Sequence, residues 1–265
     1  ALFGTPLTAA FFAMEVISVG QIYYAALIPC MASSLTAYGV SVLCGVAPVH
    51  FSLSFVPEVG VLPILEIVAL SVLCALLSIV FCRVMKGTHR YLERWIPNAY
   101  LRIAAGGLCV ALLTVALGTH DYNGAGMDVI ARAIGGQARP WDFIVKLVFT
   151  AITIGAGFRG GEIVPTFFVG ATFGCVAGGL IGIDPGFGAA VGLVATFCGV
   201  VNCPIASIFL SLELFGQGGI LFLPLPVRSA ICFRVIAAFT AAKKLCIRKS
   251  RPNISIFMQD DKGLP

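Results

Sequence analysis

A carboxylate among glycines, close to a proline, is the pattern in this chain that could do chemistry. The stretch GFRGGEIVP places Glu162 directly after Gly160 and Gly161 and three residues before Pro165, and an apolar run with small residues follows. Proline suits the first turn of a helix, where its missing N–H would have no acceptor. The free N–H groups and the positive dipole end of such a turn attract an anion. The pattern predicts an anion-binding helix start; the alternative is a tight turn whose glycines only let helices pack closely.

Glu162 is a candidate proton carrier. We expect it to be buried among glycine and aliphatic residues, and burial favours the neutral form of a carboxyl group, which can then take up and release protons. A fixed negative charge would repel the anion, so the side chain should be protonated or turned away when the anion is bound. The alternative is that Glu162 caps its own helix, where a negative side chain is stabilising.

The composition predicts an integral membrane protein. The 265 residues are 59% hydrophobic and 11% charged, with a mean hydropathy of +1.00, whereas about a quarter of the residues in soluble domains are charged. Several apolar runs exceed the ~20 residues that cross a bilayer, and strand-like alternation is missing, so we expect an all-α polytopic protein. The 30 glycines indicate close helix packing and broken helices.

Other classes of site find little support. The ten cysteines form no CxxC or Cys/His pair and lie mostly in apolar runs, so we expect packing residues, with no metal and no cofactor. His50, His89 and His120 fall near predicted helix ends and are expected at the membrane interface. The net charge of +5 is not gathered into a basic, aromatic-bearing domain, so no nucleic acid partner is expected. The sequence contains no HExxH, GxSxG or paired intramembrane aspartates, so we expect no enzyme.

The charge pattern orients the predicted spans. Residues 62–85 are long enough to cross a bilayer, and their end belongs to RVMKGTHRYLERW, which we interpret as a cationic cytoplasmic loop. Residues 99–117 then cross outward, and residues 118–140 form a polar, glycine-rich outer stretch. A helix over 142–154 leads back to the glycine-rich motif.

The start of the chain is repeated late in the sequence. FGTPLTAAFFAMEV and VNCPIASIFLSLEL each contain a proline, Pro6 and Pro204, with a glutamate nine residues later, Glu15 and Glu213. Two copies that begin with a small residue and proline are typical of two-fold transporter architectures; the alternative is chance similarity of two apolar helices. We expect both glutamates to satisfy neighbouring backbone or polar groups rather than to act in transport.

These segments resemble the CLC family of chloride channels and anion/proton antiporters. FGTPLTAAFFAMEV resembles the family's FNAPLAGxLFxxEE, GGEIVP lies where the family has GxFxP, and VVNCPIASIFLSLEL resembles TxAPLxxIxLxxE, all in the family's order. The resemblance implies a homodimer with an anion pore in each subunit, built from two inverted halves of tilted and broken helices. It assigns residues 1–58 to the end of the first half and 59–221 to the second, whose anion-site helix starts at 160–165.

The resemblance also implies the site residues. GxFxP begins at Gly161, so the backbone amides of Gly161, Glu162 and Ile163 would bind the anion, with those of Glu162 and Ile163 facing it. Gly160 and Pro165 would support the helix start. Such amides supply positive potential without a full charge, so a passing ion is bound but not trapped.

Two departures from the family pattern indicate the cargo. The second glutamate of FxxEE, which receives protons in coupled members, is Val16 here, and a carboxylate stands instead at Glu162 inside the anion motif. GGE ahead of a proline, with FFVGATFG after it, resembles the fluoride-exporting subfamily, although that subfamily commonly has threonine where this chain has Val164. We therefore predict fluoride/proton antiport; the alternatives are a chloride channel or chloride/proton exchanger, and a non-transporting membrane scaffold. Phe167 and Phe168 either line the ion path or pack helices.

The ends of the sequence depart from the family as well. The motifs GSGIP and GREGP do not precede the first helix, so we expect an N-terminally truncated fragment, inactive by itself, of a bacterial-type inner membrane protein. Residues 222–265 lack the tyrosine that the family places there and carry eight of the 17 basic residues. This tail is either a cytoplasmic extension that contacts anionic lipid or a displaced reading frame. Codons shifted over 226–249 can read CAISYMFSGYSSLYSSQKIMYSK, with the tyrosine codon straddling Phe239 and Thr240, and the nucleotide sequence distinguishes the two.

Overall fold

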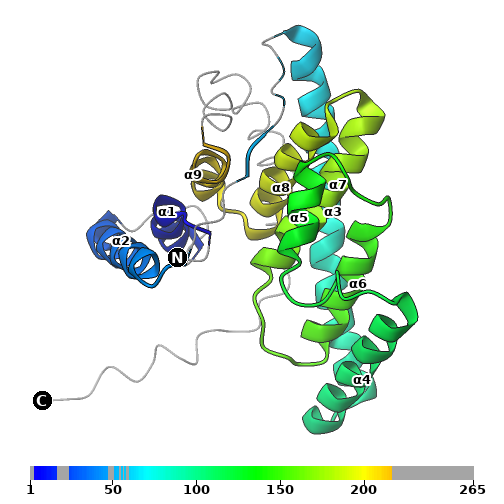
Figure 1. The fold of residues 1–265 in the computed structure, drawn as a ribbon. Coiled ribbons are helices and arrows are strands. Elements are labelled where there is room, and N and C mark those ends of the chain that lie inside the picture. Colours follow the sequence, from blue (N-terminus) through cyan, green and yellow to red (C-terminus); the bar gives the residue numbers. More distant parts are fainter. Residues whose placement is uncertain are drawn as a thin grey trace, which may run out of the picture.

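The computed structural model describes residues 3–16, 24–46, 51–53, 55, 57 and 60–216, and every regular element in these ranges is a helix (Figure 1). The all-α prediction is confirmed. The tail over 222–265, with its proposed displaced frame, lies outside the described residues. The elements are α1 (Pro6–Val16), η1 (Tyr24–Ala26), α2 (Leu27–Leu43), α3 (Val61–Trp95), α4 (Ala99–Leu117), α5 (Met127–Ile134), α6 (Asp142–Gly155), α7 (Ile163–Ile181), α8 (Pro185–Val201) and α9 (Pro204–Phe215).

Among the described helices, four are long and apolar enough to cross a membrane, over Tyr24–Leu43, Val61–Trp95, Ala99–Leu117 and Ile163–Ile181. Helices α1, α8 and α9 are apolar but shorter. Figure 1 shows two groups, with α3 and α5 to α8 packed in one bundle and α1, α2 and α9 beside it. Short and long helices side by side are consistent with the expected broken-helix architecture.

Glycines bring α7 and α8 into backbone contact. A Cβ atom added at Gly170 would lie 2.6 Å from the carbonyl oxygen of Gly192, and one added at Gly188 would lie 2.6 Å from that of Gly174. Added in the opposite sense, a Cβ at Gly174 or Gly192 would clash with the carbonyl of Gly188 or Gly170. Only hydrogen side chains permit this approach. The prediction of close helix packing is confirmed for this pair.

Helix α3 is longer than the sequence suggested. The segment RVMKGTHRYLERW, interpreted as a loop, continues the helix to Trp95, so that prediction is wrong. The packing explains the extension: Thr88 and Leu92 contact α6 at Gly155, where an added Cβ would meet them at 2.8 and 3.3 Å. Contact along this partly buried face holds a polar segment helical, because tertiary packing stabilises helices more than intrinsic propensity does.

The stretch 118–140 also contains an element that the sequence interpretation missed. Helix α5 lies within it and buries Val129, Ile130, Ala133 and Ile134. Helix α5 packs against α7 and α8 through these residues. A glycine-rich polar surrounding hid the four-residue apolar face of this short helix.

The repeated segments pack against each other and exchange caps. Glu213 of α9 accepts hydrogen bonds from the backbone N–H of Leu7 and of Thr8, both at 2.8 Å, and from the Thr8 hydroxyl at 2.7 Å. Glu15 of α1 accepts from the N–H of Ala206 at 3.0 Å and more weakly from that of its neighbour Ile205 at 3.3 Å. Each glutamate therefore satisfies free N–H groups at the start of the other helix, and the prediction that both satisfy neighbouring backbone groups is confirmed.

The two capping arrangements are equivalent, as if α1 and α9 were related by a local two-fold axis. Leu7 and Thr8 stand at the same repeat positions as Ile205 and Ala206, so the same pair of amides is capped in both helices. Phe11 and its counterpart Phe209 stack on each other, with ring centroids 4.3 Å apart and an interplanar angle of 4°. The two helices run antiparallel, and the two rings stack where the middles of the helices meet.

Candidate functional site

The turn between α6 and α7 carries the glycine-rich motif. The N–H of Gly157 caps α6, and its φ of +103° is a conformation that favours glycine. Arg102 of α4 fixes this turn, because its Nε donates to the carbonyl of Ala156 at 3.3 Å. On the same helix, a Cβ at Gly106 would clash with the Ala156 side chain. The backbone leading into the motif is thus held by two contacts from α4.

Helix α7 begins directly after the motif. Its first residue is Ile163, and Pro165 lies in the first turn, as predicted. The first helical hydrogen bond is donated by the N–H of Thr166 to the carbonyl of Glu162 at 3.1 Å, and the Thr166 hydroxyl binds the same carbonyl at 2.6 Å. Within the described ranges, no protein atom accepts a hydrogen bond from the amides of Gly160 to Val164. These donors remain open to a ligand.

The glycines of the motif do not serve helix packing in the described chain. A Cβ atom added at Gly160 or Gly161 would meet no described atom within 4 Å. Both residues are exposed, whereas Ile163, Val164 and Pro165 are partly buried. The tight-turn alternative, in which glycines only bring helices together, therefore lacks the contact it requires.

Glu162 occupies the N-cap position of α7. Its side chain makes no capping hydrogen bond, so the alternative of a self-capping carboxylate is not observed. The side chain is also exposed within the described chain, so the prediction of a buried carboxylate is wrong. Both results have the same cause: the α6–α7 turn projects the motif away from the bundle, and no described element covers it.

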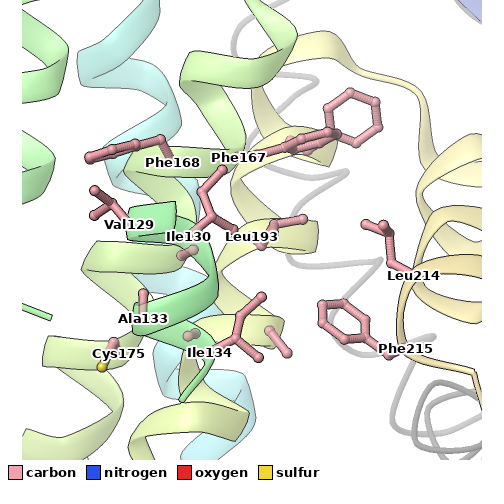
Figure 2. Close-up of a cluster of buried hydrophobic side chains, with 14 of the residues drawn as sticks. Val129, Ile130, Ala133, Ile134, Phe167, Phe168, Cys175, Leu193, Leu214 and Phe215 are labelled. Atoms are coloured by element: carbon pink, nitrogen blue, oxygen red, sulfur yellow. The ribbon is translucent and has the colours of Figure 1, made fainter. Parts of the chain in front are cut away.

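Phe167 and Phe168 lie in the core rather than on an open path. Their side chains are 3% and 0% exposed. Phe167 contacts Phe3 and Phe197, with ring centroids 5.4 and 5.1 Å away. Figure 2 shows both rings above Ile130, within a cluster of residues from α5, α7, α8 and α9. The structure favours the helix-packing alternative for these aromatics.

A buried lysine beside Phe168 was not recognised from the sequence. Lys146 of α6 is 2% exposed, and its Nζ donates to the carbonyls of Tyr122 and Gly124 at 2.9 and 2.7 Å. The same ammonium lies 4.9 Å from the centroid of the Phe168 ring, a cation–π contact. It ties the loop before α5 to α6 and α7. A single lysine within the apolar run DFIVKLVFTAITIG was the available signal, since ionisable residues in such segments are costly.

Most of the chain matches one known protein family. The model of the voltage gated chloride channel family matches residues 1–236. The chain belongs to this family. It is therefore a multi-pass integral membrane protein of an anion channel and transporter family, as the resemblance implied.

The chain is similar to two further proteins along most of its length. The chain is 35% identical over 221 residues to a protein of Pseudomonas syringae pv. tomato named chloride/fluoride channel protein, covering 81% of the chain and 49% of that protein. It is 23% identical over 223 residues to an uncharacterized protein of Methanocaldococcus jannaschii, covering 81% of the chain and 55% of that protein. The chain thus spans about half the length of these relatives.

A solved structure shares the fold. The chain superposes on a crystal structure of a CLC-type fluoride/proton antiporter with a TM-score of 0.80 at 30% sequence identity, covering 88% of the chain and 58% of that protein. The sequence prediction that this is a CLC-type fold of the fluoride subfamily is confirmed.

Proposed function

We propose that this chain is part of a transporter that exchanges fluoride for protons across a membrane. The observation that carries the proposal is the start of α7, where the amides of Gly161, Glu162 and Ile163 have no described acceptor and a carboxylate lies among them. Open N–H groups at a helix start bind an anion electrostatically, and the helix dipole adds to the attraction. The names of the similar proteins, a chloride/fluoride channel protein and a fluoride/proton antiporter, support the same cargo.

Glu162 is the proposed proton carrier. Its side chain has no capping partner and lies beside the amides, so protonation would change the charge felt by an anion at this place. A negative carboxylate would compete with fluoride for the amides, whereas the neutral form would leave them open. This alternation couples proton binding to anion binding. Gly160 and Pro165 support the arrangement by leaving space and by starting the helix without a donor.

The test is ion flux in liposomes containing the gene product that includes this chain. We expect fluoride efflux accompanied by proton uptake, and much slower chloride efflux. Equal chloride transport would reject fluoride antiport in favour of a chloride channel or chloride/proton exchanger. Val164, which replaces the subfamily's threonine, makes this comparison necessary.

Substitution of the carboxylate tests the mechanism. Glu162→Gln keeps the size of the side chain but cannot carry a proton, so we expect proton uptake to fall by at least about tenfold relative to anion flux. The matched control is Glu93→Gln on the exposed end of α3, which should leave the ratio unchanged. If Glu162→Gln retains full proton coupling, Glu162 is not the proton carrier. If the wild-type protein shows no ion flux at all, a non-transporting membrane scaffold is favoured.

We further propose a homodimer with one pore in each subunit, in the inner membrane of a bacterium. The family resemblance implies the dimer, and the Pseudomonas relative supports the compartment. The proposed inverted halves, 1–58 and 59–221, are supported by the two-fold exchange between α1 and α9. Chemical cross-linking in native membranes is expected to trap a species of twice the protomer mass, and a monomer at all protein densities would contradict the dimer.

A further inference from the structure

The last turns of α3 have one packed face and one basic face. Phe81 and Met85 are buried, and Thr88 and Leu92 contact α6. On the other side, the exposed cations follow one another at intervals of three, four and four residues, as Arg83, Lys86, Arg90 and Arg94. At about 100° per residue, the four lie within an arc of roughly 80°, opposite the packed face. We call these four residues the basic face.

The basic face starts where the hydrocarbon layer should end. Between Val61 and Cys82 the sequence carries a single charged residue, Glu66. About 20 apolar residues cross the hydrocarbon core, so the first cation, Arg83, falls at the membrane surface. The 35 residues of α3 correspond to about 52 Å, which exceeds the ~30 Å core and carries the remaining cations into the headgroup region and beyond. The excess of Lys and Arg indicates the cytoplasmic side.

Two aromatic side chains flank the basic face. Tyr91 and Trp95 are 59% and 69% exposed, and their ring centroids lie 5.5 Å apart. Tyr and Trp are enriched where membrane meets water, because an apolar ring carries a polar tip. Long cationic side chains extend back towards the same layer. The two aromatics lie level with Arg90 and Arg94, about 12–18 Å along the helix from Arg83. A basic face that begins where the apolar run ends fits an anionic lipid surface better than a soluble anion.

We propose that the basic face of α3 binds the headgroups of anionic phospholipids on the cytoplasmic side of the membrane. Each cation near such a surface contributes attraction that falls off over about one Debye length, ~8 Å at physiological salt. Arg83 and Lys86 lie nearest to the headgroups. The opposite face contacts Gly155 of α6, so lipid bound here stabilises the helix end that precedes the glycine-rich motif.

The experiment is a lipid titration followed by native mass spectrometry on the purified gene product in neutral detergent. Phosphatidylglycerol is the anionic probe and phosphatidylcholine the neutral one. We expect tighter binding of phosphatidylglycerol, weakened by about 30-fold in the double variant Arg83→Gln and Lys86→Gln, since each cation is worth about fivefold. The matched control is Arg132→Gln with Arg139→Gln. These two exposed cations lie in the stretch predicted on the outer side of the membrane, and the variant should keep the wild-type affinity. The measurement needs no transport activity and is independent of the proposed function.

Several outcomes would overturn the proposal. Equal affinity of the wild type for both lipids would do so without any variant. An equal loss in the control pair would show a general charge effect rather than a site. Displacement of phosphatidylglycerol by millimolar inorganic phosphate, but not by sodium chloride of the same ionic strength, would indicate a soluble anion site instead. Exchange of the two charges, Arg83→Lys with Lys86→Arg, preserves the basic face and should preserve binding.

Discussion

Tyr122 shows how the loop before α5 is fastened. Its side chain is 4% exposed, and its hydroxyl donates to the Asp142 carboxylate at 2.6 Å, while its carbonyl accepts from Lys146. Asp142 also accepts from the N–H of Arg139 at 3.1 Å. Burial, together with the hydrogen bond to Asp142, raises the pKa of Tyr122 to about 12. The phenol is therefore held in its neutral, donating form.

This geometry predicts a pH dependence. The ordinary tyrosine pKa is 10.0; because the folded value is higher, the hydroxyl contributes its full stability below about pH 10 and loses it as the pH rises towards about 12. Tyr122→Phe should cost about 1.5–3 kcal/mol at neutral pH, the value of a hydrogen bond to a charged group. The variant should also lack this alkaline loss. Thermal unfolding in detergent from pH 7 to pH 12 measures both, and parallel wild-type and variant curves would contradict the assignment.

At the scale of elements, the glycine contact between α7 and α8 is the tightest constraint. A Cβ at Gly192 would lie 2.6 Å from the Cα of Gly174, in addition to its clash with Gly170. Both neighbours are backbone atoms, which cannot turn aside as a flexible side chain can. Gly192→Ala should therefore force the helices apart and cost about 1–3 kcal/mol or more.

The control for this substitution lies on α7, the other helix of the pair. A Cβ at Gly179 would meet its nearest described neighbour, Pro185, at an ordinary 3.7 Å. Gly179→Ala should be neutral or slightly stabilising, since alanine restricts the unfolded chain and favours the helix. Unfolding of both variants by a denaturing detergent provides the comparison. Equal stabilities would mean that the helices do not approach as closely as described.

The capping exchange between α1 and α9 gives a second element-scale prediction. Glu213 accepts three hydrogen bonds of 2.7 to 2.8 Å, whereas Glu15 accepts two of 3.0 and 3.3 Å. Both should matter, since each bond to a charged group contributes about 1.5–3 kcal/mol and loss of a cap costs about 1 kcal/mol. Glu213→Ala should destabilise more than Glu15→Ala. The ranking can be checked by thermal unfolding, and the reverse order would contradict the geometry.

Across the whole molecule, the sequence predicted features that depend on one short segment, and it did not predict features that depend on contacts between distant segments. Pro165 after two glycines predicted the start of α7, and the proline and glutamate spacing predicted that α1 and α9 are related, because each signal lies within one segment. The exposure of Glu162, the end of α3 and the partners of Lys146 depend on residues far along the chain. Thr88 and Leu92 turned a predicted loop into helix through contacts with α6, and no property of the loop sequence alone reports them.

The predicted orientation concerns the whole chain and can be tested directly. The basic end of α3 should face the cytoplasm and the loop before α5 the outside. Alkaline phosphatase, which is active only outside the cytoplasm, can be fused after Trp95 or after Asn123. We expect activity for the second fusion and little for the first. Equal activities would contradict the predicted orientation. The reverse order would invert it and would place the basic face of α3 outside the cytoplasm.

The hydrogen bonds between α1 and α9 also determine when the start of α1 can be capped during synthesis of the chain. Leu7 and its acceptor Glu213 are 206 residues apart in the chain. At about 5–20 residues per second, the ribosome reaches the acceptor roughly 10–40 s after it has made the donor. During this interval the first turn of α1 lies in the membrane without its acceptor, although α2, which also packs against α1, is already present. The start of α1 is thus capped only after α9 has been made, and insertion must tolerate an unfinished helix end while the intervening residues are synthesised.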